Sequence, residues 1–179
     1  MIRFKPVPAP PDRLGDLEPV RRAVPLVPAG EIECRRRLAR RVGIEDRDEA
    51  LAWLTFMRAL GVVDRTDRGY RRIHDEPTPA ALRDRFRRRV YGATEALAAL
   101  SAADEPLTAS AVAAHTADVE PAWERRRSAD PTRAWEERTG RLLGWCLPLG
   151  LVDRVGLRGA GSHDDAPAYR LTGGGSRRP

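Results

Sequence analysis

Residues 46–73, with the sequence DRDEALAWLTFMRALGVVDRTDRGYRRI, decide the fold of this chain. Apolar residues recur in the first half at intervals of three and four, which predicts a helix. Gly61 ends that helix, and the two valines after it open a strand. A turn containing Asp67 and Gly69 leads to a second strand that begins at Tyr70. The stretch therefore predicts a helix followed by a two-stranded hairpin.

The same pattern returns later in the chain. Residues 148–154 read PLGLVDR, where residues 59–65 read ALGVVDR, and a second Tyr-Arg pair follows at 169–170. Gly150 is predicted to end the second helix, and the second hairpin has a longer turn, over residues 156–166. Self-similarity of this kind indicates two copies of one structural unit.

A helix that passes through glycine into a two-stranded wing, preceded by a shorter helix, resembles the winged helix-turn-helix superfamily. The resemblance covers residues 12–76 and 77–172. It implies a mainly α fold with small β-hairpin wings (α+β), in which two tandem winged-helix domains are joined by a long helix over residues 80–100. It also places a very short first strand near residue 30. Residues 1–11 are predicted to form a flexible proline-rich arm, and residues 173–179 a flexible tail.

The basic residues of the chain are almost all arginine. Lys5 is the only lysine among 32 basic residues, and the net charge is +6. The Arg-rich, Asp-rich composition, with phrases such as GIEDRDEA, resembles haloarchaeal proteins. A positive charge departs from the acidity usual in that group, so it favours a polyanion or an acidic protein surface as partner. Residues 1–76 and 77–179 each hold 16 basic and 13 acidic side chains, so neither half stands out as basic.

The densest charge lies in a predicted helix over residues 33–42, ECRRRLARRV. Cys34, Leu38 and Val42 are spaced four apart, which predicts one narrow buried stripe. The arginines cover the remaining surface. They form either a solvated face or a set of phosphate contacts, because arginine pairs with phosphate in a fork geometry. The predicted DNA-binding residues of this helix are Arg36, Arg37, Arg40 and Arg41.

The helix over residues 46–60 takes the place of the usual reading helix of a winged domain. Asp46 or Asp48 can cap it, and its acidic first turn opposes direct base readout. Its predicted DNA-binding donors are Arg47 and Arg58. Its apolar residues cover more than one face, which indicates packing on the neighbouring unit or on a partner. The predicted partner-binding residues are Trp53, Phe56 and, in a later segment, Trp123.

The first wing is suited to a contact with the DNA backbone. Four arginines cluster around its tight turn, and Asp64 and Asp67 can pair with some of them. Surface pairs of this kind contribute only ~0–1 kcal/mol each, so they leave the positive charges largely accessible. The predicted DNA-binding residues of the wing are Arg65, Arg68, Arg71 and Arg72.

The long helix and the second unit suggest other roles. Apolar residues of the helix follow a nearly heptad spacing, which predicts packing between the units or the seam of a homodimer. The helix predicted over residues 109–117 contains no arginine, so the two units are not functionally equivalent. The heptad residues are Leu82, Phe86, Val90, Ala93, Leu97 and Leu100.

Signatures of catalysis and of metal binding are absent from the sequence. His74, His115 and His163 are isolated, and no phosphate loop or dinucleotide fingerprint occurs. We therefore expect no enzyme activity, no metal and no cofactor. Cys34 and Cys146 lie within apolar helical patterns. Two isolated thiols of this kind suggest a reducing cytoplasm. The longest apolar run, residues 142–152, is too short to span a membrane, and no apolar leader begins the chain.

Two functions of different classes follow. The first is a DNA-binding winged-helix protein, a transcriptional regulator or chromosome-associated factor, that holds double-stranded DNA mainly by its phosphates. The alternative is a protein–protein adaptor without nucleic-acid binding. Segregation and condensation proteins of the B type and the small subunit of the ESCRT-II complex have such a tandem architecture. An exposed apolar patch on helix 46–60 or on the long helix would favour the adaptor, and a continuous arginine stripe would favour DNA.

Overall fold

The chain divides into two compact units. The structure is a computed structural model that describes residue 4 and residues 6–120, 129–156 and 166–173. Unit 1 spans Met1–Tyr91 and unit 2 spans Gly92–Pro179. The division therefore lies after Tyr91, whereas the sequence analysis placed the domain boundary between residues 76 and 77.

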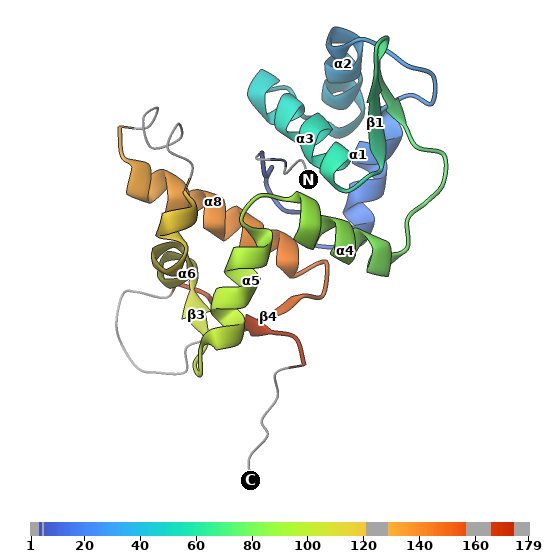
Figure 1. Cartoon of the computed structure of the whole chain (residues 1–179). Coiled ribbons are helices and arrows are strands. Elements are labelled where there is room, and N and C mark those ends of the chain that lie inside the picture. The colour runs from blue at the N-terminus through green and yellow to red at the C-terminus, as the bar shows by residue number, and fades with distance from the viewer. Residues whose placement is uncertain (1–3, 5, 121–128, 157–165, 174–179) are drawn as a thin grey trace. The chain divides into compact units, whose positions relative to one another are not determined.

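Unit 1 has the order of helices and strands expected for a winged helix (Figure 1). Helix α1 packs on α2, and α2 packs on both α3 and β2. The one helix and the hairpin predicted from residues 46–73 are confirmed as α3, β1 and β2. The elements of unit 1 are η1 (Leu14–Asp16), α1 (Leu17–Ala23), α2 (Glu31–Val42), α3 (Arg47–Ala59), β1 (Val63–Thr66), β2 (Gly69–Arg72) and α4 (Pro79–Arg89).

Helix α3 is closed at both ends by groups that the sequence identified. The Asp46 carboxylate accepts a hydrogen bond of 2.8 Å from the Glu49 N–H, so Asp46 is the cap. At the other end Gly61 has a φ of 66°. The N–H of Gly61 donates to the Arg58 carbonyl, and the next N–H donates to the Met57 carbonyl. This pair of bonds ends a helix at a left-handed glycine and sends the chain into β1.

The wing of unit 1 is attached to the segment before α2. Ala29 and Tyr70 exchange two backbone hydrogen bonds, of 2.8 and 2.9 Å, which form an isolated bridge where a short first strand was expected near residue 30. Gly69, beside Tyr70, has a φ of 118°, and a Cβ there would lie 2.1 Å from the Ala29 carbonyl oxygen. Glycine is therefore required where the wing meets this segment.

Unit 2 repeats this plan with a three-stranded sheet in the order β3-β5-β4. Gly150 has a φ of 64°, and its N–H donates to the Leu147 carbonyl as the Gly61 N–H does to Arg58. Arg154 lies opposite Tyr169, just as Arg65 lies opposite Tyr70. Both units are therefore winged helices. The elements of unit 2 are α5 (Ala93–Ala102), β3 (Leu107–Thr108), α6 (Ala109–His115), η2 (Ala117–Val119), α8 (Pro131–Cys146), β4 (Val152–Val155) and β5 (Ala168–Leu171).

The prediction of a single long helix over residues 80–100 is wrong. Helix α4 ends at Arg89, Val90 is extended, and Gly92 has a φ of 83° before α5 begins. The break is fixed by Phe4, whose N–H donates to the Arg89 carbonyl at 2.6 Å and whose carbonyl accepts from the Tyr91 N–H at 2.9 Å. These bonds pair Val90 with Phe4 in a parallel bridge, so the helix does not continue past Arg89.

The prediction of a flexible N-terminal arm also differs from the structure. Besides the backbone bonds of Phe4, Val7 and Pro8 are buried. The guanidinium carbons of Arg58 and Arg89 each lie 5.3 Å from the centroid of the Phe4 ring. The described part of the arm is thus bound to its own chain. The predicted tail over residues 173–179 lies, beyond Gly173, outside the described residues.

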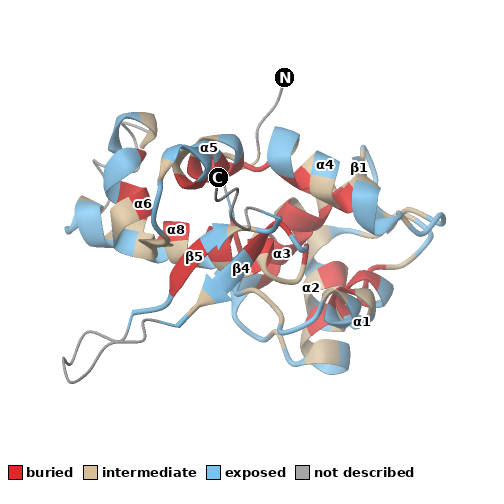
Figure 2. Ribbon diagram, turned by 90° about the horizontal axis from the view of Figure 1, so that it is seen from below, coloured by how far each residue is buried: buried red, intermediate tan, exposed pale blue. Residues whose placement is uncertain are grey.

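The core holds most of the large apolar side chains. Buried residues follow α3 in unit 1 and α8 with β5 in unit 2 (Figure 2). In unit 1 the Phe56 and Phe86 rings meet edge to face, 6.2 Å between centroids. All six heptad residues of the predicted long helix are buried, so they form no exposed dimer seam. No helix in the described parts of the chain is both long and apolar enough to cross a membrane.

Candidate nucleic-acid interface

Helix α2 presents arginines on the side away from its buried stripe. Cys34 and Leu38 are fully buried, as their spacing predicts, and Val42 is half-buried. Arg36 and Arg40 are exposed and, being four residues apart, project from one face of the helix. The structure thus provides an accessible pair of guanidinium groups on α2.

Acidic neighbours neutralise only part of this charge. Glu33 pairs with Arg36 at 3.2 Å and with Arg37, which is half-buried, at 3.3 Å. Within the described residues no ion pair involves Arg40 or Arg41. Because exposed pairs on a helix are weak, the Arg36 guanidinium can exchange Glu33 for a phosphate.

Helix α3 is poorly suited to reading bases. Its first turn exposes Asp48 and Glu49 beside the Asp46 cap, with Arg47 as the exposed cation there. Carboxylates at a helix N-terminus stabilise the helix, but they repel an approaching phosphate. This arrangement agrees with the expectation that α3 makes little direct contact with bases.

The predicted partner-binding residues do not form an exposed surface. Trp53 is 6% exposed and Phe56 is fully buried. Both side chains belong to the core, because α3 is apolar on more than one side and is covered there. The third residue, Trp123, lies outside the described residues. The prediction of a partner site at Trp53 and Phe56 is therefore wrong.

Arg58, a predicted DNA-binding donor, is half-buried over the Phe4 ring. Arg89 lies over the same ring, and burial lowers the pKa of Arg89, with the charges of Arg85 and Arg58 as further causes. The Arg85 Nη1 donates to the carbonyls of Leu60 and Gly61, at 3.1 and 3.2 Å. Arg58, Arg85 and Arg89 therefore stabilise the fold of unit 1.

The four predicted arginines of the first wing do not share one surface. Arg65 lies over Tyr70, its partner across the hairpin, with 5.5 Å between guanidinium carbon and ring centroid. Arg71 extends from the opposite face of the hairpin and pairs with Asp64 at 3.2 Å. Arg68 is exposed in the turn, while Arg72 is half-buried at the end of β2. The four arginines therefore do not form the continuous stripe that would favour DNA over a protein partner.

The structure instead gathers arginines from three elements in one cleft of about 410 Å³, here called the basic cleft. Arg41 of α2 and Arg72 of β2 come together there, although they are far apart in sequence. Arg21 and Arg22 were missed by the sequence analysis, and the only signal for them is their adjacency at the end of α1. The lining residues are Arg21, Arg22, Leu26, Arg41, Arg72 and His74.

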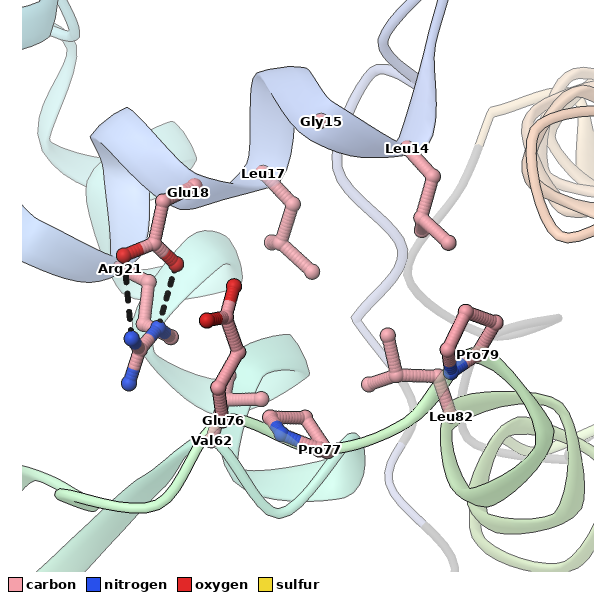
Figure 3. A pocket seen from close by; sticks show the side chains of 10 residues that line it. All are labelled: Leu14, Gly15, Leu17, Glu18, Arg21, Val62, Glu76, Pro77, Pro79 and Leu82. Carbon is pink, nitrogen blue, oxygen red and sulfur yellow. Dashed lines mark hydrogen bonds and ion pairs between the residues drawn. The ribbon is translucent and has the colours of Figure 1, made fainter.

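Arg21 lines this cleft with a side chain that is held in place by its own hydrogen bonds. It is 6% exposed, and its Nε and Nη2 donate to the two carboxylate oxygens of Glu18 at 2.6 and 3.0 Å. Its Nη1 donates to the Ile73 carbonyl at 2.8 Å. The hydrogen bond from Arg21 is the largest cause of a lowered pKa at Glu18. Figure 3 shows this pair beside a second, mostly apolar cavity of about 330 Å³, which Arg21 and Leu17 also line.

Comparison with known proteins identifies the family. A family model described as the halobacterial double winged helix domain matches residues 2–165. The chain belongs to this family. The match includes the described helices of both units and ends before β5, and it confirms the prediction of a tandem winged-helix protein of haloarchaeal type. No curated protein and no solved structure matches the chain.

In this halobacterial double winged helix chain the net positive charge is carried by unit 1. Unit 1 contains 21 basic and 14 acidic side chains, and unit 2 contains 11 and 12. The even division expected from the sequence arose because the five arginines of α4 were assigned to the second domain. In unit 2, moreover, Arg138 is buried over Trp135. The candidate interface therefore lies on unit 1.

Proposed function

We propose that the protein binds double-stranded DNA through unit 1, mainly by contacts with phosphates. The observation that carries this proposal is the segregation of charge, with 21 basic against 14 acidic side chains in unit 1 and a near balance in unit 2. A winged-helix unit with an exposed pair at Arg36 and Arg40 fits a partner that carries regularly spaced negative charge.

The arrangement favours phosphate contacts over base recognition. The acidic first turn of α3 disfavours entry of that helix into a groove, while the arginines of α2 and of the wing turn are accessible. Phosphate contacts fix a protein on the duplex without reading its sequence. The protein therefore acts as a transcriptional regulator of low intrinsic specificity or as a chromosome-associated factor.

The remaining parts of the proposal follow from the same features. We assign the protein no enzymatic activity and no cofactor, because its sequence carries no phosphate loop, dinucleotide fingerprint or metal-ligand spacing. Cys34 and Cys146 are buried and form no disulfide with each other, which fits a reducing compartment, so we place the action of the protein in the cytoplasm.

Fluorescence anisotropy with a random-sequence duplex, titrated over a series of salt concentrations, tests the proposal. We expect tight binding at low salt and a steep decline of log affinity with log salt, because phosphate contacts release counterions. The double variant Arg36→Ala/Arg40→Ala should weaken binding and reduce the slope by roughly two, since each phosphate contact contributes about 0.9.

The matched control removes two arginines from the other unit. Arg154 and Arg170 are exposed on the wing of unit 2, so Arg154→Ala/Arg170→Ala lowers the net charge equally. This control should keep nearly wild-type affinity and slope. Equal losses in the two double variants would mean that net charge alone governs binding, and an absence of binding at low salt would reject the proposal.

One observation favours the alternative, a protein–protein adaptor. Three large apolar side chains are exposed around the start of α2: Leu26 at 46%, Val27 at 75% and Ile32 at 71%. These residues lie near the α1–α2 connection, and not on helix 46–60 or the predicted long helix, where an exposed apolar patch would have favoured the adaptor. The variant Val27→Ser/Ile32→Ser separates the two functions. For an adaptor it should abolish association with the partner or a second copy, measured by sedimentation, and no duplex binding should be detected for the wild type.

A further inference from the structure

We propose that the basic cleft is a phosphate-binding site that holds one phosphate of the nucleic-acid backbone. The identity of the phosphate's source rests on the proposed function, whereas the affinity for a phosphate group rests on the cleft itself. The site lies at the base of the wing, between the ends of α1, α2 and β2, and not at the acidic start of α3.

The charges around the cleft are unbalanced in favour of an anion. Four guanidinium groups line it, and its described lining includes no carboxylate. The Glu18 carboxylate is already bound by Arg21 and by Arg22, each at 2.6 Å, and the Asp75 carboxylate lies 3.7 Å from the His74 ring. Arg41 contributes an Nη1 that makes only a long contact, 3.4 Å, with the Arg22 carbonyl. Its remaining donors are suited to a phosphate oxygen.

Arg72 lines the cleft and carries an unsatisfied donor. Its Nε is buried and has no hydrogen-bond partner among the described residues. Its backbone is fixed, because the Arg72 N–H donates to the Pro25 carbonyl at 2.7 Å. A buried N–H without a partner is unfavourable, and an anion that enters the cleft and accepts from it relieves that cost.

The other unit indicates that the fold itself does not require arginine at this position. Arg72 lies opposite Val63 in the hairpin of unit 1, and Leu171 lies opposite Val152 at the same register position in unit 2. A leucine therefore satisfies the packing of a wing base. The arginine of unit 1 is thus explained by its charge and its donors, and unit 2 has leucine at the corresponding position.

The size and the lining of the cleft suit a phosphate attached to a sugar. Its volume of about 410 Å³ lies in the range of small-ligand sites. Arginine forks bind two phosphate oxygens at once, and the preorganised Arg21 supplies positive charge without moving. Leu26, which is 46% exposed, adds an apolar contact at the rim for the sugar. The same chemistry would accept a phosphate from a small molecule, and the experiment distinguishes the two sources.

The test observes the arginine Nε–H groups of the full chain by ¹⁵N nuclear magnetic resonance. Inorganic phosphate and, separately, a random-sequence duplex are titrated into wild-type protein and into Arg72→Leu. Phosphate should shift the Nε signals of Arg22, Arg41 and Arg72 saturably, and the duplex should shift the same set. In Arg72→Leu the phosphate response should weaken at least severalfold, and the salt slope of duplex binding should fall by about 0.9, which corresponds to one contact.

The outcomes test the phosphate site and the binding of DNA separately. Shifts with phosphate but none with duplex support the cleft as a site for a small phosphate compound and reject DNA binding. Shifts with duplex at Arg36 and Arg40 but none at Arg72 overturn the site and leave DNA binding standing. A response to neither ligand rejects both. If thermal unfolding shows that Arg72→Leu is not folded, Arg22→Ala replaces it, because the Arg22 side chain is 67% exposed.

Discussion

At the scale of single residues, Gly69 links the wing to the rest of unit 1. It combines a φ of 118° with a Cβ position 2.1 Å from the Ala29 carbonyl oxygen. The change Gly69→Ala should therefore lower the free energy of unfolding by at least about 1–3 kcal/mol, the cost of a strained backbone conformation. Urea denaturation followed by circular dichroism measures this difference.

A second glycine provides the control for this prediction. Gly15 in η1 has no atom within 4 Å of its Cβ position and no left-handed φ, so Gly15→Ala should change stability little. If Gly69→Ala proved as stable as Gly15→Ala, the close approach of the wing to Ala29 would be contradicted.

Individual residues with local roles could be predicted from sequence. Asp46 caps α3, Gly61 ends it, and Leu38 is buried on α2, because each role depends on neighbours within about one turn. Arg58 and Arg72 could not be placed in the same way. Their surroundings, the Phe4 ring and the basic cleft, are formed by segments distant in sequence. Helical spacing alone cannot reveal such neighbours.

At the scale of elements, α4 completes the end of α3. Arg85 of α4 donates to the Leu60 and Gly61 carbonyls, which helix geometry leaves without partners. Arg85→Ala should reduce the free energy of unfolding by roughly 1–3 kcal/mol, since the bonds come from a charged donor. Thermal and urea unfolding would record the loss.

The same helix offers a comparison residue. Arg88 is an exposed partner of Asp84, so Arg88→Ala should cost only ~0–1 kcal/mol. Equal effects of the Arg85 and Arg88 substitutions would show that Arg85 has no role in closing α3.

Elements with strong local signals were predicted well, and the junction between α4 and α5 was not. The apolar spacing from Leu82 to Leu100 continues through the break, so the pattern favours one helix. The break depends on backbone bonds from Phe4, about 85 residues away in the chain. Its one local signal is Gly92, and glycine alone within a helical pattern weakens a helix without ending it.

At the scale of the whole molecule, the units differ in charge. Because unit 1 holds the excess of arginine, we expect hydrogen–deuterium exchange of the full chain to slow on duplex binding in α2 and in the β1–β2 hairpin. Peptides from α6 and α8 should exchange at unchanged rates. Equal protection of α6, whose sequence has no arginine, would contradict an interface confined to unit 1.

The shared register of the two hairpins has a consequence for folding. Asp64 and Asp153 each lie opposite an arginine, and Arg65 and Arg154 each lie opposite a tyrosine, so these two central pairs can also form between a strand of one hairpin and a strand of the other. Mispairing between repeated units is a characteristic error of such chains. During synthesis the first hairpin is complete before the second emerges. Refolding from denaturant presents all four strands together, and exchanged pairs must then separate before the native pairs form.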